Sequence, residues 1–208
     1  HIDIDPAEIG KNVAVDLPIV GDAKIVLNQL IKELEAKPSD KNAWLKSIVE
    51  FKKSTIPRVS YDDIPLKPQQ VIKEIANSIT EDTIVTTDVG LHQMWAAHFL
   101  DISKPRKFIS SGGLGTMGFG IPAAIGAKIG APKRTVCMFA GDGGFQMTIQ
   151  ELGTIMEKQI GVKMIILNNN YLGMVRQWQE LFFKKRYSST PMMNPHFNTI
   201  ADAYGIKN

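Results

Sequence analysis

Hydrophobic residues in the later part of the chain fall into short uninterrupted runs, and segments with helical periodicity separate these runs. The predicted elements are strands over 83–87, 135–140 and 162–167 and helices over 69–79, 91–100, 119–129 and 147–158. Strands without polar alternation are typical of a parallel sheet that is covered on both faces. The order of the elements therefore predicts an α/β fold with a doubly wound parallel sheet flanked by helices.

The first third of the chain has a different pattern. Residues 1–10 alternate apolar and polar positions up to Pro6, which indicates a strand that enters a loop. Apolar residues then recur at helical spacing over 22–34 and 39–53, and the three prolines of 54–68 indicate a linker. We expect three segments: an end piece of one domain (1–20), a helical linker (21–67) and the domain that holds the parallel sheet (68–208).

Composition and charge limit the classes of protein to which the chain can belong. The chain has 208 residues, 44% of them hydrophobic, and a net charge of +3, which is too small to indicate a nucleic-acid partner. No apolar run approaches the ~20 residues of a membrane span. The single Cys137 lies in an apolar run, so we expect a buried thiol and a reducing, cytoplasmic setting. The chain starts at His1 rather than Met, and we expect an excised fragment of a longer protein.

Polar residues follow two of the predicted strands directly. Gly141-Asp142-Gly143-Gly144 follows one strand and Asn168-Asn169 follows the next, with Asp142 and Asn169 27 positions apart. A βαβ unit of ~30 residues places both at the carboxyl edge of the sheet, where α/β sheets bind ligands. The glycines permit close approach of an anion, and a carboxylate with an amide oxygen suits Mg²⁺. Each motif alone is also a common turn, but together they predict a site for a magnesium-bound diphosphate.

A second glycine-rich block, Gly113, Gly115 and Gly118, has the spacing of a dinucleotide fingerprint. That fingerprint requires an acidic residue about 20 positions later. No Asp or Glu lies between Gly113 and Gly141. The dinucleotide interpretation therefore fails, unless Arg134 serves a phosphorylated ribose.

These motifs resemble a known family. The stretch 141–174 resembles the thiamine-diphosphate signature, and GMVRQWQE over 173–180 resembles acetolactate synthase large subunits. The resemblance covers residues 68–206 and, more loosely, 1–57. It implies that 68–208 is a thiamine-diphosphate-binding domain, that 1–20 ends the central domain, and that the family continues beyond residue 206.

The resemblance assigns roles to individual residues. It implies that Asp142 and Asn169 bind Mg²⁺ through their side chains and Tyr171 through its main-chain carbonyl. Met117 would lie between the cofactor's two rings and hold it bent. The implied cofactor-binding set is Leu91, His92, Gly115, Thr116, Met117, Asp142, Gly143, Gly144, Asn169, Tyr171, Leu172 and Gly173. The family often has Gln where Leu91 stands, and a lone His92 near a helix start is also typical of a capping residue.

The implied substrate channel is formed by Met174, Val175 and Trp178. The alternative is that Met174, Trp178 and Leu181 recur at helical spacing because they belong to the core. Residues after Phe182 are expected to form a mobile loop that orders over the site.

The implied reaction is that of a transferase: pyruvate loses CO₂ and condenses with a second 2-oxo acid, pyruvate or 2-oxobutyrate, in branched-chain amino-acid biosynthesis. The resemblance also implies a homodimer or tetramer, FAD bound mostly outside these residues, and a possible regulatory small subunit. No catalytic residue is expected here, because the activating glutamate belongs to another domain. We therefore expect weakened cofactor binding and no turnover. The alternatives are a 2-oxo acid decarboxylase or pyruvate oxidase, a magnesium-nucleotide module, and a fragment without a ligand.

Overall fold

The computed structural model describes residues 1–35, 42–55, 64–102 and 107–208. The chain divides into two compact units, residues 1–57 and residues 58–208, and each is described by itself. Part of the predicted linker over 54–68 lies outside the described residues. The assignment of the three segments to domains remains a prediction.

The described residues of the first unit form two short parallel strands and two helices. Strand β1 (Ile2–Asp3) pairs with β2 (Ile19–Val20), and helices α1 (Ala23–Glu35) and α2 (Asn42–Ser54) follow. Helix α1 starts where expected because the Asp22 carboxylate accepts a hydrogen bond from the Ile25 N–H at 3.0 Å. The predicted strand at the start is confirmed but shorter, and β2 was not predicted because two residues carry no periodic signal.

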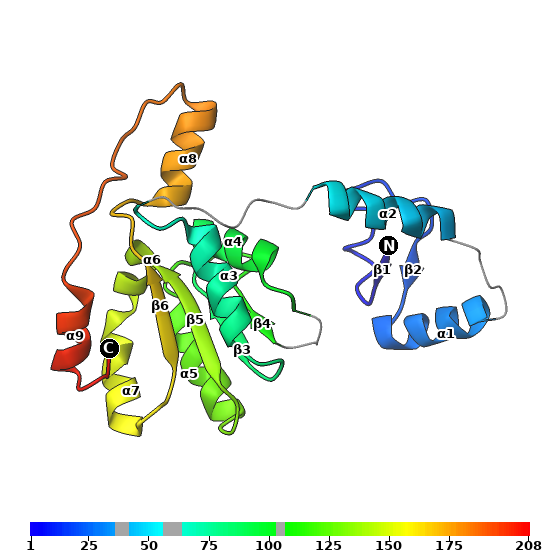
Figure 1. The fold of residues 1–208 in the computed structure, drawn as a ribbon. Coiled ribbons are helices and arrows are strands. Elements are labelled where there is room, and N and C mark those ends of the chain that lie inside the picture. The colour runs from blue at the N-terminus through cyan, green and yellow to red at the C-terminus, as the bar shows by residue number, and fades with distance from the viewer. Residues whose placement is uncertain (36–41, 56–63, 103–106) are drawn as a thin grey trace. The chain divides into compact units, whose positions relative to one another are not determined.

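The second unit is the predicted α/β domain (Figure 1). Its sheet has the order β4-β3-β5-β6, and every neighbouring pair is parallel. The strands are β3 (Ile84–Thr87), β4 (Phe108–Ile109), β5 (Val136–Gly141) and β6 (Lys163–Leu167). Three of these strands confirm the prediction. The fourth, β4, was missed because it has only two residues, both half-buried.

Helices precede, connect and follow the strands of this sheet. They are α3 (Pro68–Ser78), α4 (Leu91–Phe99), α5 (Gly120–Gly130), α6 (Asp142–Met147), α7 (Leu152–Lys158), α8 (Gly173–Phe182) and α9 (Phe197–Ala203), with a 3₁₀ turn at Ile149–Glu151. The predicted single helix over 147–158 is wrong. The chain turns helical directly after β5 and breaks at Thr148, whose hydroxyl donates a hydrogen bond to the Gly118 carbonyl at 2.9 Å.

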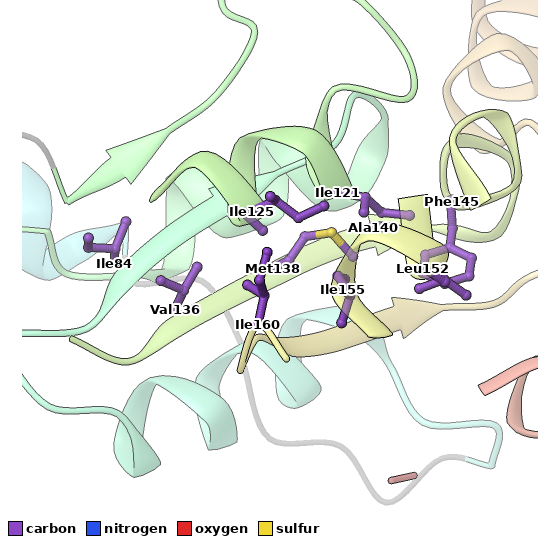
Figure 2. Close-up of a cluster of buried hydrophobic side chains, with 11 residues drawn as sticks. Ile84, Ile121, Ile125, Val136, Met138, Ala140, Phe145, Leu152, Ile155 and Ile160 are labelled. Carbon is purple, nitrogen blue, oxygen red and sulfur yellow. The ribbon is translucent and has the colours of Figure 1, made fainter. Parts of the chain in front are cut away.

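Two hydrophobic clusters lie on opposite faces of the sheet. One joins Val136, Met138 and Ala140 of β5 to the buried residues of α5 and α7 (Figure 2). The other joins Phe139 to the buried residues of α3 and α4. Successive residues of β5 thus enter different cores, which explains why the strand reads as a continuous apolar run. Cys137 of the same strand is free and buried, as expected, and burial raises the pKa of its thiol.

The order in which successive strands are added to the sheet reverses at β3. Its next strand along the chain, β4, pairs on one side of β3, and β5 pairs on the other side. The connection after β3 therefore leads to one side of the sheet, and the connection after β5 leads to the other side. Such a switch point opens a crevice between the two loops, and it is the usual ligand site of a doubly wound sheet.

Replacement of Met138 by alanine tests the first cluster. The Met138 side chain has no exposed surface, so the truncation leaves a cavity in the core. We expect the free energy of unfolding to fall by about 2–5 kcal/mol, measured by urea denaturation. Met94→Ala, at a helix position that is 53% exposed, is the matched control and should have little effect. Equal losses in the two variants would contradict the assigned core.

Candidate functional site

A cavity of about 800 Å³ lies at the carboxyl edge of the sheet. Its walls come from the loops after β3, β5 and β6, together with Gly115 and Met117. The predicted site residues that line it are Leu91, His92, Gly115, Met117, Asp142, Gly143, Gly144, Asn169, Tyr171, Leu172, Gly173, Met174 and Val175. Thr116 and Trp178 are not among the lining residues. The topology thus brings together four sequence blocks that lie between Leu91 and Val175 along a chain of βα units.

Asp142 is the most constrained side chain of this cavity. It follows β5 directly and is only 2% exposed. Its Oδ2 accepts hydrogen bonds from the Asn170 N–H at 2.8 Å and from the Asn194 amide nitrogen at 2.6 Å. Among the described residues, no donor contacts Oδ1. The carboxylate is therefore held from one side, and its second oxygen is free to bind a cation.

The turn after β6 supplies further oxygen atoms. The Asn169 Oδ1 accepts a hydrogen bond from the Tyr171 N–H at 2.9 Å, which keeps the amide oxygen beside the turn. Asn170 has φ +59°, in the left-handed region that asparagine tolerates better than most residues. One carboxylate, one amide oxygen and main-chain carbonyls are hard ligands that suit Mg²⁺ when phosphates complete its shell. The described residues contain no group of three or more His, Cys, Asp or Glu side chains that suits a metal held by protein alone.

His92 lies in the first turn of α4 and is 5% exposed. Burial lowers the pKa of its imidazole to about 4, against a weaker opposing effect of the hydrogen bond with the Asp88 backbone. The ring is therefore neutral near pH 7. Its Nε2 has no hydrogen-bond partner among the described residues, although the residue lines the cavity. An unpaired buried ring nitrogen is costly, and a ligand that hydrogen-bonds to it would remove this cost.

Asp88 is a second buried carboxylate, directly after β3, and 1% of its surface is exposed. Its Oδ1 accepts a hydrogen bond from the Gly120 N–H at 3.1 Å, at the start of α5. Burial raises the pKa of this carboxyl group, while hydrogen bonds from the 118–120 backbone oppose the rise. Asp88 was assigned no role in the sequence analysis. Its position directly after a buried strand was the available signal.

Gly143 and Gly144 are required by close packing rather than by their backbone angles. A Cβ at Gly144 would lie 1.4 Å from Asp88 Oδ2, and a Cβ at Gly143 would lie 2.8 Å from Leu172 Cδ2. The first turn of α6 is thus pressed against the loops that follow β3 and β6. These two glycines hold the three loops of the cavity together.

Helix α8 starts at the cavity and extends away from the sheet (Figure 1). Met174 and Val175 line the cavity, whereas Trp178 is 57% exposed. No residue of α8 is buried, so the alternative that its apolar positions form core is wrong. The Arg176 guanidinium stacks between two rings, 4.3 Å from the centre of Tyr171 and 4.1 Å from that of Tyr187.

The segment after α8 pairs with the turn that follows β6. The Leu172 N–H donates to the Thr190 carbonyl at 2.9 Å, and the Met192 N–H donates to the Asn170 carbonyl at 2.8 Å. Sequence reasoning expected a loop over the site but missed Asn194, because a single asparagine between Met193 and Pro195 carries no pattern. The predicted mobility of this loop remains a prediction.

Comparison with known proteins agrees with this geometry. Residues 88–208 match the family described as "Thiamine pyrophosphate enzyme, C-terminal TPP binding domain". The chain belongs to this family.

The predicted resemblance to acetolactate synthase large subunits is confirmed as well. The chain is 52% identical to a "Probable acetolactate synthase large subunit" of Methanococcus aeolicus, and the match covers 100% of the chain and 37% of the relative. It is 46% identical to the acetolactate synthase large subunit of Lactococcus lactis, and this match covers 100% of the chain and 36% of the relative. It is 44% identical to the acetolactate synthase isozyme 3 large subunit of Escherichia coli, and this match covers 99% of the chain and 37% of the relative. The chain thus spans little more than a third of these relatives.

The cavity offers both room and polar groups for a ligand. Its volume of about 800 Å³ falls in the usual range for cofactor sites. It combines a buried carboxylate, an unpaired imidazole nitrogen and closely packed glycines at the start of α6.

Within the described part of the chain, no helix is long and apolar enough to cross a membrane.

Replacement of Gly144 by alanine tests the packing of the three loops. The new methyl group would overlap the Asp88 carboxylate, so the carboxylate or α6 must move. We expect the free energy of unfolding to fall by about 3 kcal/mol or more. Gly112→Ala is the control, because nothing lies within 4 Å of a Cβ at that position. A Gly144→Ala variant as stable as Gly112→Ala would show that the loops are not closely packed.

His92 predicts a specific dependence of stability on pH. Its pKa is about 4 in the folded chain, compared with 6.5 for an unperturbed histidine. Between these values the unfolded chain binds a proton that the folded chain does not bind, so stability falls as the pH drops through this window. The loss amounts to roughly 3 kcal/mol at most. His92→Gln should remove this loss in urea titrations at pH 7 and pH 5, whereas exposed His98→Gln should retain it.

Proposed function

We propose that this chain is the cofactor-binding part of an acetolactate synthase. It holds thiamine diphosphate through Mg²⁺, and the complete enzyme condenses pyruvate with a second 2-oxo acid, pyruvate or 2-oxobutyrate, in branched-chain amino-acid biosynthesis. One observation carries the proposal: the half-free Asp142 carboxylate and the asparagine turn after β6 line the same cavity. The acetolactate synthases named above support the main prediction over the alternative of a decarboxylase or pyruvate oxidase.

In this proposal, Asp142, Asn169 and the Tyr171 carbonyl bind Mg²⁺. The free Oδ1 of Asp142 faces no competing donor among the described residues, and Asn169 is exposed beside it on the turn. Three protein oxygens leave the remaining positions of an octahedral shell to the diphosphate and to water. Asp142 lines the cavity and has one oxygen without a donor among the described residues, which supports this assignment.

The start of α4 and the start of α6 hold the diphosphate in this proposal. Helix α4 begins after Gly90 and α6 begins after Gly141, and both glycines line the cavity. Free N–H groups at a helix start attract anions. The unpaired Nε2 of His92 offers a further contact. Gly115 and Met117 also line the cavity, and in this proposal the cofactor's rings lie beside them. When bound, the cofactor supplies the electron sink for loss of CO₂.

Met174, Val175 and Trp178 form the substrate channel in this proposal. Met174 and Val175 line the cavity, and Trp178 lies one helical turn further along α8, 57% exposed. The apolar side of α8 continues to Leu181 and Phe182, which are 64% and 72% exposed. Exposed apolar surface of this extent is typical of a protein interface.

The rest of the active site belongs to other parts of the enzyme. The chain spans 36–37% of its relatives, and the activating glutamate is proposed to come from another domain of a homodimer or tetramer. FAD, a regulatory small subunit and a cytoplasmic location complete the proposal. The single free, buried cysteine supports a reducing compartment.

Calorimetric titration with thiamine diphosphate, with and without Mg²⁺, tests the proposed site. We expect binding that requires Mg²⁺ and that Asp142→Asn weakens by at least about 100-fold, because the variant removes the only carboxylate ligand. Asp82→Asn is the matched control, since Asp82 is exposed and distant from the cavity lining. Binding that ignores Mg²⁺, or equal affinity in both variants, would contradict the proposal. Displacement by a nucleotide diphosphate would favour a nucleotide-binding module instead.

A further inference from the structure

The amide nitrogen of Asn194 lies among three oxygen atoms. It is 2.6 Å from Asp142 Oδ2, 2.8 Å from Asn168 Oδ1 and 3.0 Å from Asn170 Oδ1. An amide nitrogen carries only two hydrogens, so three acceptors share two donors. Asn194 therefore joins the end of β5 to the turn after β6 through one atom.

The orientation of this amide is set from the other side. The Gln146 amide nitrogen donates to Asn194 Oδ1 at 2.9 Å and to the Asp142 carbonyl at 3.2 Å. Because Gln146 occupies the oxygen of Asn194, the nitrogen of Asn194 must face the three acceptors. The backbone is fixed as well, since Met192 pairs with Asn170 two residues before Asn194.

We propose that Asn194 is a positioning residue for the cation site, an inference that rests on the proposed function. Asn194 holds Oδ2 of Asp142 so that Oδ1 is left for the cation. It also takes up the oxygens of Asn168 and Asn170, whereas the oxygen of Asn169 is bonded only to the Tyr171 N–H. The same amide thus occupies the side-chain oxygens of Asn168 and Asn170 and leaves the side-chain oxygen of Asn169 for the cation.

A neutral donor suits this role better than a cationic one. A lysine or arginine in the same place would neutralise Asp142 and repel a divalent cation. Among the ion pairs of the described residues, none involves Asp142. Asn194 therefore fixes the direction of the carboxylate without reducing its attraction for Mg²⁺. Hydrogen bonds of this kind to a ligating carboxylate typically affect metal affinity strongly.

The test compares Asn194→Ala with Met193→Ala in the 208-residue chain. Met193 is the adjacent residue and is 99% exposed, so its truncation controls for changes in the same segment. We expect Asn194→Ala to weaken the apparent Mg²⁺ affinity about 10- to 100-fold at a fixed thiamine diphosphate concentration. Saturating Mg²⁺ should restore the affinity for the cofactor, which general structural damage would not allow. An unchanged Mg²⁺ affinity would overturn the proposal.

A second readout needs no ligand. The Asn170 N–H donates to Asp142 Oδ2, so its hydrogen exchange reports whether the carboxylate stays in place. We expect Asn194→Ala, but not Met193→Ala, to accelerate this exchange by about tenfold or more. If the unmodified chain does not bind magnesium and thiamine diphosphate, the proposed function fails, and this exchange rate alone decides the role of Asn194: acceleration supports it and no change overturns it. If Asn194→Ala does not fold, Gln146→Met, which frees the amide to rotate, must show the same effects in weaker form, and their absence overturns the proposal.

Discussion

A carboxylate buried at the end of a strand must be satisfied by nearby donors, and Asp142 is the group around which this domain is arranged. Placing a charge in the interior without hydrogen-bond or ionic partners costs roughly several kcal/mol or more. Two donors meet this need at Oδ2, and both come from segments that follow β6 in the sequence, at Asn170 and Asn194. The turn after β6 and the segment after α8 are therefore held against the end of β5 by the same oxygen atom.

Asp88 imposes the corresponding constraint at the end of β3. Its carboxylate fixes the start of α5 through the Gly120 N–H and fills the space that a side chain at Gly144 would occupy. Two adjacent parallel strands thus end in buried carboxylates with opposite consequences. Asp88 accepts donors from the fold itself and packs the loops together. Asp88 also has an oxygen without a partner, Oδ2, but that atom is buried against Gly144, whereas Asp142 lines the cavity, and this difference makes Asp142 the proposed ligand.

The chain belongs to the thiamine pyrophosphate family and spans 36–37% of the length of its relatives. The described residues provide an oxygen-rich edge and an apolar wall on α8, but α8 has no buried residue of its own. Nor does the described part of α1 bury its apolar positions: Ile25, Ile31 and Leu34 are more than half exposed. Surfaces of this kind are typical of segments that pack against further protein. The proposed catalysis accordingly depends on groups beyond this chain.

The sequence by itself determined the parallel sheet, its three main strands and the identity of Asp142 and Asn169 as candidates, because uninterrupted apolar runs and residues directly after them are local signals. It did not determine β4, the break at Thr148 or the exposure of Trp178, since a two-residue strand has no period and a helical apolar stripe fits a core and a surface equally well. Only the tertiary structure selected Asn194. That residue acts on an acceptor 52 positions away, and the choice depends on which segments the sheet topology brings to the end of β5.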